Sequence, residues 1–147
     1  MGMKRTAAVA AGVAGATALA LGLGTAPAGA AAALLSHDHT FTATSGAPVS
    51  CEVWTYQEWL DFNAKFRTEL RGPEACRATE VVVGWRYTDT AGVRHRGRQI
   101  AVGGRVAEAT FSNVADGQLV GRHRVEFAGC AQDCTFGPYE FAPFSSK

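Results

Sequence analysis

Apolar and polar residues alternate most regularly between Val81 and Thr88. One face of this predicted strand carries Val81, Val83, Trp85 and Tyr87, and the other carries Val82, Gly84, Arg86 and Thr88. The sequence from Asp89 to Gly92 is typical of a turn, because Gly92 can adopt a positive φ. Residues 81–102 therefore predict a β-hairpin whose second strand is Val93–Val102.

Three further segments predict strands, and turn residues separate them. The segments are Val106–Phe111, Leu119–Phe127 and Thr135–Phe141, with Gly103-Gly104 before the first and Asp116-Gly117 before the second. Short strands with turn signals at this spacing are typical of an antiparallel sandwich or barrel.

One segment, residues 56–71, has the pattern of a helix. Thr55 and Glu58 are spaced as a capping box, and Gly72-Pro73 provides a stop. Aromatic and apolar residues recur at three- and four-residue steps, at Trp59, Phe62, Phe66 and Leu70. Such a stripe usually packs against a sheet, so we expect it to be part of the core.

These elements together predict a mainly β fold with one helix: an antiparallel β-sandwich or barrel, immunoglobulin-like in general architecture. We expect one disulfide-linked domain over residues 51–147, with the helix packed on one end or face. Residues 31–50 are small and polar and predict a flexible N-terminal lead, in which residues 39–44 could pair as an edge strand.

Residues 1–30 have the organisation of a secretory signal peptide. Lys4 and Arg5 precede an Ala- and Gly-rich apolar run, which ends in Ala28-Gly29-Ala30. A membrane anchor is the alternative, but the run is short and weakly hydrophobic. We therefore expect cleavage near Ala30 and a secreted, extracellular protein that does not stay in the membrane.

The four cysteines, in an exported chain, predict two disulfides. We favour Cys51 with Cys76, which bracket the predicted helix, and Cys130 with Cys134, which are separated by only three residues. An immunoglobulin-like Cys76–Cys130 pair is the rival, but Ala128 stands where that class has a tyrosine. A redox or metal role for the last pair would need free thiols and usually a CxxC spacing or histidine ligands.

The layout as a whole combines an Ala-rich signal, a short β domain and the CxxxC of Cys130 and Cys134 near the end of the sequence. In this it resembles small exported proteins of unknown function that are common in actinobacteria. The resemblance implies no particular active site.

Charge argues against two classes of partner. Removal of Lys4 and Arg5 leaves 12 of the 14 basic residues against 13 acidic ones, so the mature chain is near neutral. A general binder of nucleic acid or of membrane surfaces is much more basic.

Sequence motifs for catalysis and cofactor binding are absent. The chain has no GxSxG, HExxH, phosphate-loop or dinucleotide motif, and we expect no cofactor. His37-Asp38-His39 is the one metal-like cluster, but it lies in the predicted lead, so we expect no metal site.

The candidate binding residues are cationic and aromatic. Alternate residues of a strand share a face, so arginines at alternate positions project together. The arginines concerned are Arg94, Arg96 and Arg98 on one predicted strand, Arg122 and Arg124 on another, and Arg86 across the hairpin. Trp54, Tyr56 and Trp59 cluster at the start of the predicted helix and are the aromatic candidates. A solvated outer face that discourages edge-to-edge aggregation would also explain the arginines.

The leading hypothesis is a non-catalytic binding module for an extracellular protein or an anionic polymer of the cell envelope, with an enzyme inhibitor as one specific form. One alternative is an exported hydrolase with His95 or His123 beside Asp89 or Glu126. The other is a structural protein of the envelope or spore surface.

Overall fold

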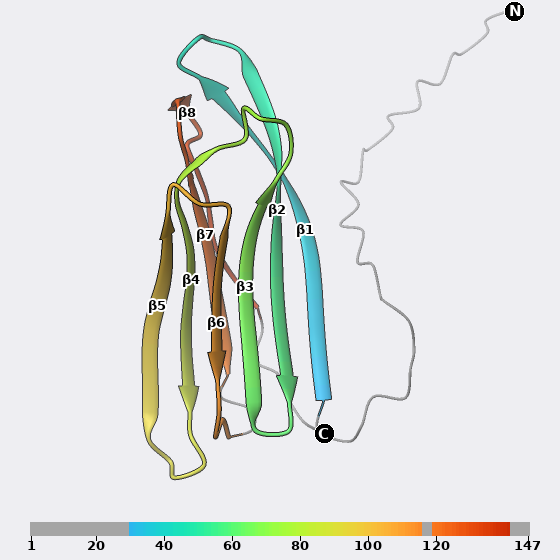
Figure 1. Ribbon diagram of the computed structural model, residues 1–147, viewed down its shortest axis with the longest axis vertical. Helices are drawn as coiled ribbons and strands as arrows, with labels where there is room; N and C mark the ends of the chain where they lie inside the picture. The colour runs from blue at the N-terminus through green and yellow to red at the C-terminus, as the bar shows by residue number, and fades with distance from the viewer. Residues whose placement is uncertain (1–29, 116–118, 142–147) are drawn as a thin grey trace, which may run out of the picture.

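A computed structural model describes residues 30–115 and 119–141, and within them nine strands form two antiparallel sheets (Figure 1). The first sheet has the order β6-β3-β2-β1-β8, with β1 (Ala30–Ala43), β2 (Pro48–Leu60), β3 (Asn63–Arg71), β6 (Val106–Phe111) and β8 (Cys130–Gln132). The second has the order β5-β4-β7-β9, with β4 (Ala78–Thr88), β5 (Arg94–Val102), β7 (Val120–Phe127) and β9 (Thr135–Glu140). The sheets pack as an open sandwich, so the sandwich is confirmed and the barrel is not.

The predicted helix at residues 56–71 is wrong, because this segment is the β2–β3 hairpin. Leu60 pairs with Asn63 around a two-residue turn, and Asp61 has a φ of 53°, a conformation that aspartate tolerates. Thr55 therefore caps no helix; it lies fully buried between the sheets. Within the described residues the structure contains no helix, hence none that is long and apolar enough to cross a membrane.

The predicted flexible lead at residues 31–50 is also wrong, because most of it lies in the first sheet; only at residues 39–44, where a strand was expected, does the prediction agree with β1. β1 pairs with β2 along its length, from Ala30 opposite Leu60 to Thr42 opposite Pro48. The predicted signal peptide lies outside the described residues except for Ala30, where β1 begins.

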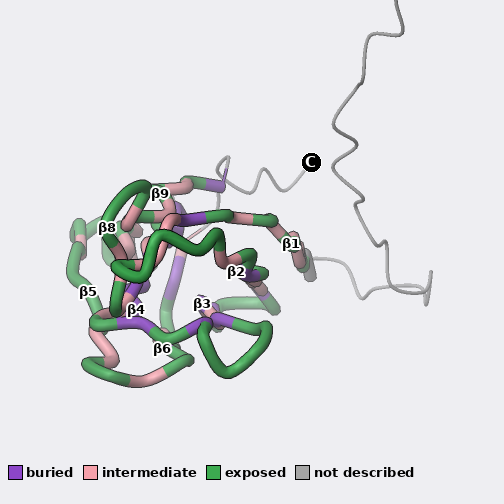
Figure 2. The backbone as a smooth tube through the Cα atoms, turned by 90° about the horizontal axis from the view of Figure 1, so that it is seen from above, coloured by how far each residue is buried: buried purple, intermediate pink, exposed green. Residues whose placement is uncertain are grey.

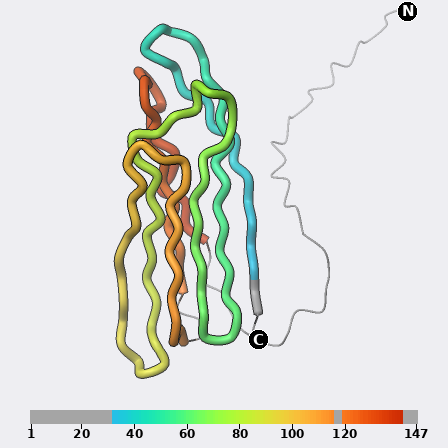
Figure 3. Tube along the Cα trace, viewed as in Figure 1, coloured from blue at the N-terminus to red at the C-terminus, as the bar shows by residue number. Residues whose placement is uncertain are grey.

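The strand predictions in the second half of the chain agree well with the structure. The hairpin predicted over residues 81–102 is β4–β5, and the segments predicted at 106–111, 119–127 and 135–141 are β6, β7 and β9. The predicted turn at Asp116-Gly117 lies outside the described residues. β6 returns across the molecule to lie beside β3, although the two are far apart in sequence (Figure 3).

The core lies between the sheets and follows from the two-residue period of each strand. Buried and partly exposed residues alternate along β2 and β3. Figure 2 is viewed from above and colours the buried residues purple. Phe66 and Leu70 point inward from β3, and Phe41 stacks on Phe127 with ring centroids 4.9 Å apart. Phe62, predicted in the core, lies at the β2–β3 turn and is 59% exposed, because no helix carries it inward.

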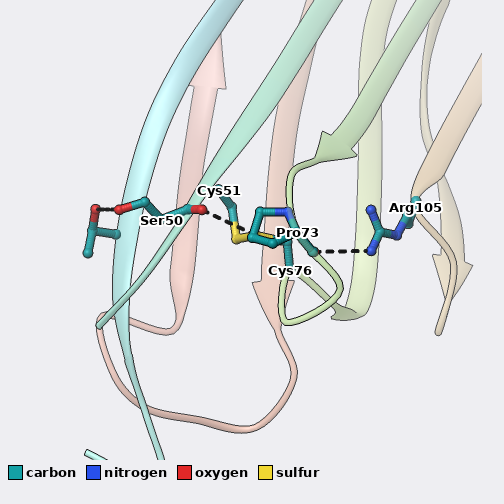
Figure 4. Close-up of a disulfide and its surroundings, with 6 residues drawn as sticks. Ser50, Cys51, Pro73, Cys76 and Arg105 are labelled. Carbon is teal, nitrogen blue, oxygen red and sulfur yellow. Dashed lines mark hydrogen bonds between the residues drawn. A yellow bond between two sulfur atoms is a disulfide. The ribbon is translucent and has the colours of Figure 1, made fainter. Parts of the chain in front are cut away.

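Both favoured disulfides are confirmed. Cys51 at the start of β2 bonds to Cys76, and Cys130 bonds to Cys134 (Figure 4 shows the first pair). Gly72 makes the first bond possible, because a Cβ at this position would lie 2.8 Å from the Cys76 Sγ. Gly72 also has a φ of 132°, a conformation that favours glycine.

Candidate functional site

The outer face of the β5-β4-β7-β9 sheet brings all six candidate arginines together. Strand alternation turns Arg94, Arg96 and Arg98 of β5, Arg86 of β4, and Arg122 and Arg124 of β7 to the side away from the core. Because β4 pairs with β5 on one edge and β7 on the other, the two arginine strands flank it. The sequence prediction that these side chains share a face is consistent with this register.

The register arranges these residues in rungs across the sheet. In one rung Gly84 of β4 lies between Arg98 and Arg122. In the next, Arg86 lies between Arg96 and Val120, and on the other side of Gly84, Val82 lies between Ile100 and Arg124. We call the hollow over Val82, Gly84 and Arg86 the arginine groove; it has a volume of about 760 Å³.

Gly84 explains why the face is hollow. It is the residue without a side chain in the middle of the central rung, so the arginines on either side are separated by open space. The three atoms nearest to a Cβ built at Gly84 are the Arg122 Cβ and the Gly97 carbonyl oxygen at 3.6 Å and the Arg122 carbonyl oxygen at 3.7 Å. These are ordinary van der Waals distances, so the fold does not require glycine at this position.

Acidic residues neutralise only one side of the groove. Arg124 makes ion pairs of 3.1 Å with both Glu80 and Glu126, and Arg122 lies 3.6 Å from Glu140. In contrast, no described carboxylate lies within 4 Å of the guanidinium groups of Arg86, Arg94, Arg96 or Arg98. The uncompensated positive charge is therefore concentrated along β5 and at Arg86.

The aromatic candidates do not form one cluster. Trp54 and Tyr56 lie on the outer face of the other sheet, whereas Trp59 points inward and is 7% exposed. The Arg71 guanidinium lies 4.0 Å from the centroid of the Trp54 ring, and the Trp54 Nε1 donates to Glu52 over 2.9 Å. Burial and then a hydrogen bond with Glu58 raise the pKa of Tyr56 to about 12, so its hydroxyl stays protonated.

The charges around these aromatics are paired with one another. Lys65 lies 3.2 Å from Glu108, and Arg67 and Arg71 each lie 2.7 Å from Glu69. The hydrogen bond from Arg71 is the main cause that lowers the pKa of Glu69. The charges on this face therefore neutralise one another, unlike those of the arginine groove.

The two histidines of the metal-like cluster have other partners. The His37 Nε2 lies 3.0 Å from the Thr55 hydroxyl, and the His39 Nε2 donates to the Asp133 carbonyl over 2.7 Å. Among the residues that the structure describes, no group of three His, Cys, Asp or Glu side chains could hold a metal ion.

The histidines of the hydrolase hypothesis lie in different environments. His95 donates to Asp89 over 2.8 Å, but the other Asp89 oxygen accepts from the Ala91 and Val93 amides, so the pair stabilises the β4–β5 turn. The His95 hydrogen bond, followed by the Val93 amide, lowers the pKa of Asp89. His123 is fully buried between the sheets, and Glu126 projects from the opposite face of β7.

The sequence prediction omitted the floor of the groove, formed chiefly by Val82, Gly84 and Val120. The signal was available, since Gly84 shares a strand face with Arg86. Its importance depends on the strand order, which places it between Arg98 and Arg122. Comparisons with family models, with curated proteins and with solved structures gave no match for this chain.

Proposed function

We propose that this chain is an exported, non-catalytic binding module that holds an anionic ligand in the arginine groove. The ligand is either a polymer of the cell envelope or an acidic surface of an extracellular protein; an enzyme inhibitor would be one form of the latter. We further propose that the sandwich that carries the groove is immunoglobulin-like in general architecture.

One observation supports the proposal above the others: four arginines that have no carboxylate partner among the described residues lie beside or along a hollow with an apolar floor. On the outer face of the other sheet, by contrast, interspersed glutamates pair with the basic residues. Guanidinium groups bind carboxylates and phosphates through paired hydrogen bonds, which suits them to anion recognition.

Reversing the charge of Arg96 and Arg98 tests the site. We expect R96E/R98E to bind fluorescent polyphosphate or poly-L-glutamate at least tenfold more weakly than the unmodified protein at moderate salt, about 0.15 M, because two charge-assisted contacts are lost. Fluorescence anisotropy gives the dissociation constants, and circular dichroism checks that the variant is folded.

R77E/R105E is the matched control. Both residues are exposed and lie off the groove, and the double substitution changes the net charge by the same amount. We expect its affinity to stay within about twofold of that of the unmodified protein, since local contacts decide binding at moderate salt. Equal losses in the two variants would mean that only net charge matters, and the proposed site would be wrong.

A further inference from the structure

Two neighbouring rungs of the arginine groove offer separate positions for anions. At the Gly84 rung, Arg98 and Arg122 lie on strands that are two apart, roughly 9.5 Å, so both can bend over the glycine toward one ligand group. The Arg122–Glu140 pair is long, at 3.6 Å, and exposed, so Arg122 loses little when it turns to a ligand.

At the next rung, Arg86 and Arg96 are directly opposite each other. Like charges in this cross-strand position repel and destabilise a sheet. No described carboxylate lies within 4 Å of either guanidinium to relieve the repulsion. An anion from a ligand would relieve it, so this rung is the second anion position. Its distance from the first is about 7 Å, two residues along a strand.

The third rung limits the charged part of the site. Val82 is 7% exposed, and Arg124 beside it is already paired with Glu80 and Glu126. A ligand that continues along β4 in this direction therefore meets an apolar floor and a neutralised arginine. This part of the groove suits an uncharged part of the ligand.

The backbone under the groove distinguishes between two kinds of linear polyanion. β4 is a central strand, and its hydrogen-bonding groups pair with β5 on one side and β7 on the other. An acidic peptide lying over β4 would find no free backbone partner for its own amides, and unpaired polar groups are costly to bury. A polyol chain joined by phosphodiesters has no N–H donors; its phosphate oxygens and hydroxyls can accept hydrogen bonds from the guanidinium groups that line the groove.

We propose, resting on the function proposed above, that the ligand is a linear phosphodiester polymer of the polyol-phosphate type. It lies along β4 with successive phosphates at the Gly84 and Arg86 rungs. The arginines of the two rungs match the spacing of the ligand's phosphates. Because Gly84 has no side chain, the polymer can lie between the arginines on either side of it. An acidic protein segment is the competing occupant.

The length of the ligand gives the first test. Synthetic glycerol-phosphate oligomers with one, two, three and four phosphates are titrated into the oxidised protein by calorimetry. We expect affinity to rise at least tenfold from one phosphate to two, and less than threefold for each phosphate after that. A steady rise at every added phosphate would overturn the two-rung assignment, because it is what non-specific attraction produces.

Filling the groove gives the second test. We expect G84V to lower affinity for the two-phosphate oligomer at least tenfold without lowering the thermal midpoint, since a Cβ fits there and β-branched residues suit strands. The affinity of G84A for the same oligomer should lie between those of G84V and the unmodified protein. T110V, on the exposed outer face of the other sheet, is the control and should bind as the unmodified protein does.

The outcomes separate this proposal from the one on which it rests. If R96E/R98E weakens binding but G84V does not, the phosphodiester assignment is wrong and the anion-binding function survives. If an alternating Glu-Gly peptide of equal charge binds more tightly than the oligomers and G84V abolishes that binding, the ligand is an acidic segment. If no probe responds to R96E/R98E, both proposals fail.

Discussion

Replacing Cys51 and Cys76 with alanine lowers the free energy of unfolding by at least about 3.5 kcal/mol, whereas C130A/C134A lowers it by about 2 kcal/mol. The difference follows from the loops that the disulfides close, with sequence separations of 25 and 4 residues. A longer loop restricts the unfolded chain more. Cys51 and Cys76 are also almost fully buried, so their truncation removes core packing as well.

Chemical denaturation of the two double variants, under identical oxidising conditions, checks this expectation. The structure links Cys51 on β2 to Cys76 just before β4, so this bond joins elements of the two sheets. The C130A/C134A variant is the internal control, because it removes the same chemical groups from a short loop. Equal losses of stability in the two variants would contradict the loop-based account.

The protein also loses stability as the pH falls below about 6.5, because of His123. Burial, and to a smaller extent the charge on His37, lowers the pKa of His123 from 6.5 to about 3 in the folded state. The unfolded chain therefore binds a proton that the folded chain does not. The loss from this group is about 2 kcal/mol at pH 5 and about 3 kcal/mol at pH 4.

The hydrogen bonds around His123 explain why it stays neutral. The Thr68 hydroxyl donates its single proton to the Val82 carbonyl over 3.0 Å. The His123 Nδ1, 2.8 Å from the same oxygen, must then be the donor, which leaves Nε2 without a proton. Within the described residues Nε2 is buried and has no hydrogen-bond partner, so a proton on it would be unsatisfied.

H123Q tests this prediction, since glutamine keeps an N–H donor but does not titrate. Unfolding free energies measured from pH 7.5 to pH 5 should decline by about 2 kcal/mol less in H123Q than in the unmodified protein. Carboxylates with lowered pKa values, such as Asp89 and Glu69, lose their contribution to the free energy of unfolding at more acidic pH. They are present in both proteins, so they do not affect the difference. Parallel pH profiles would show that His123 is not held neutral.

The error of predicting a helix at residues 56–71 also has a physical explanation, which is that polar residues are buried in this segment. The inward positions of β2 and β3 include Thr55, Gln57 and Thr68, which are all fully buried. These polar residues conceal the two-residue period that would have indicated strands. Trp59, Phe66 and Leu70, which do point inward, fit helical spacing equally well. Local spacing could not show that such polar residues would find partners inside the sandwich, where Thr68 bonds to His123 and Gln57 accepts from the Gly121 amide.

In β4 the same approach succeeded because the inward positions are hydrophobic. Val81 and Val83 are fully buried, and the outward positions carry Gly84 and Arg86. The arginines could be placed on one face from their spacing alone. The strand order could not be predicted, since it depends on how β7 returns beside β4. For this reason the arginines were predicted, but the groove between them was not.

We infer that anions bind over β4, and an amide NMR titration detects such binding residue by residue. The probe is the glycerol-phosphate oligomer with two phosphates, added to the ¹⁵N-labelled, oxidised protein. We predict saturable shifts in the amides of residues 82–86, 96–98 and 120–122, and none along residues 54–58 or 65–71 on the other sheet. Shifts confined to that other sheet, or no shifts at millimolar oligomer, would contradict the claim.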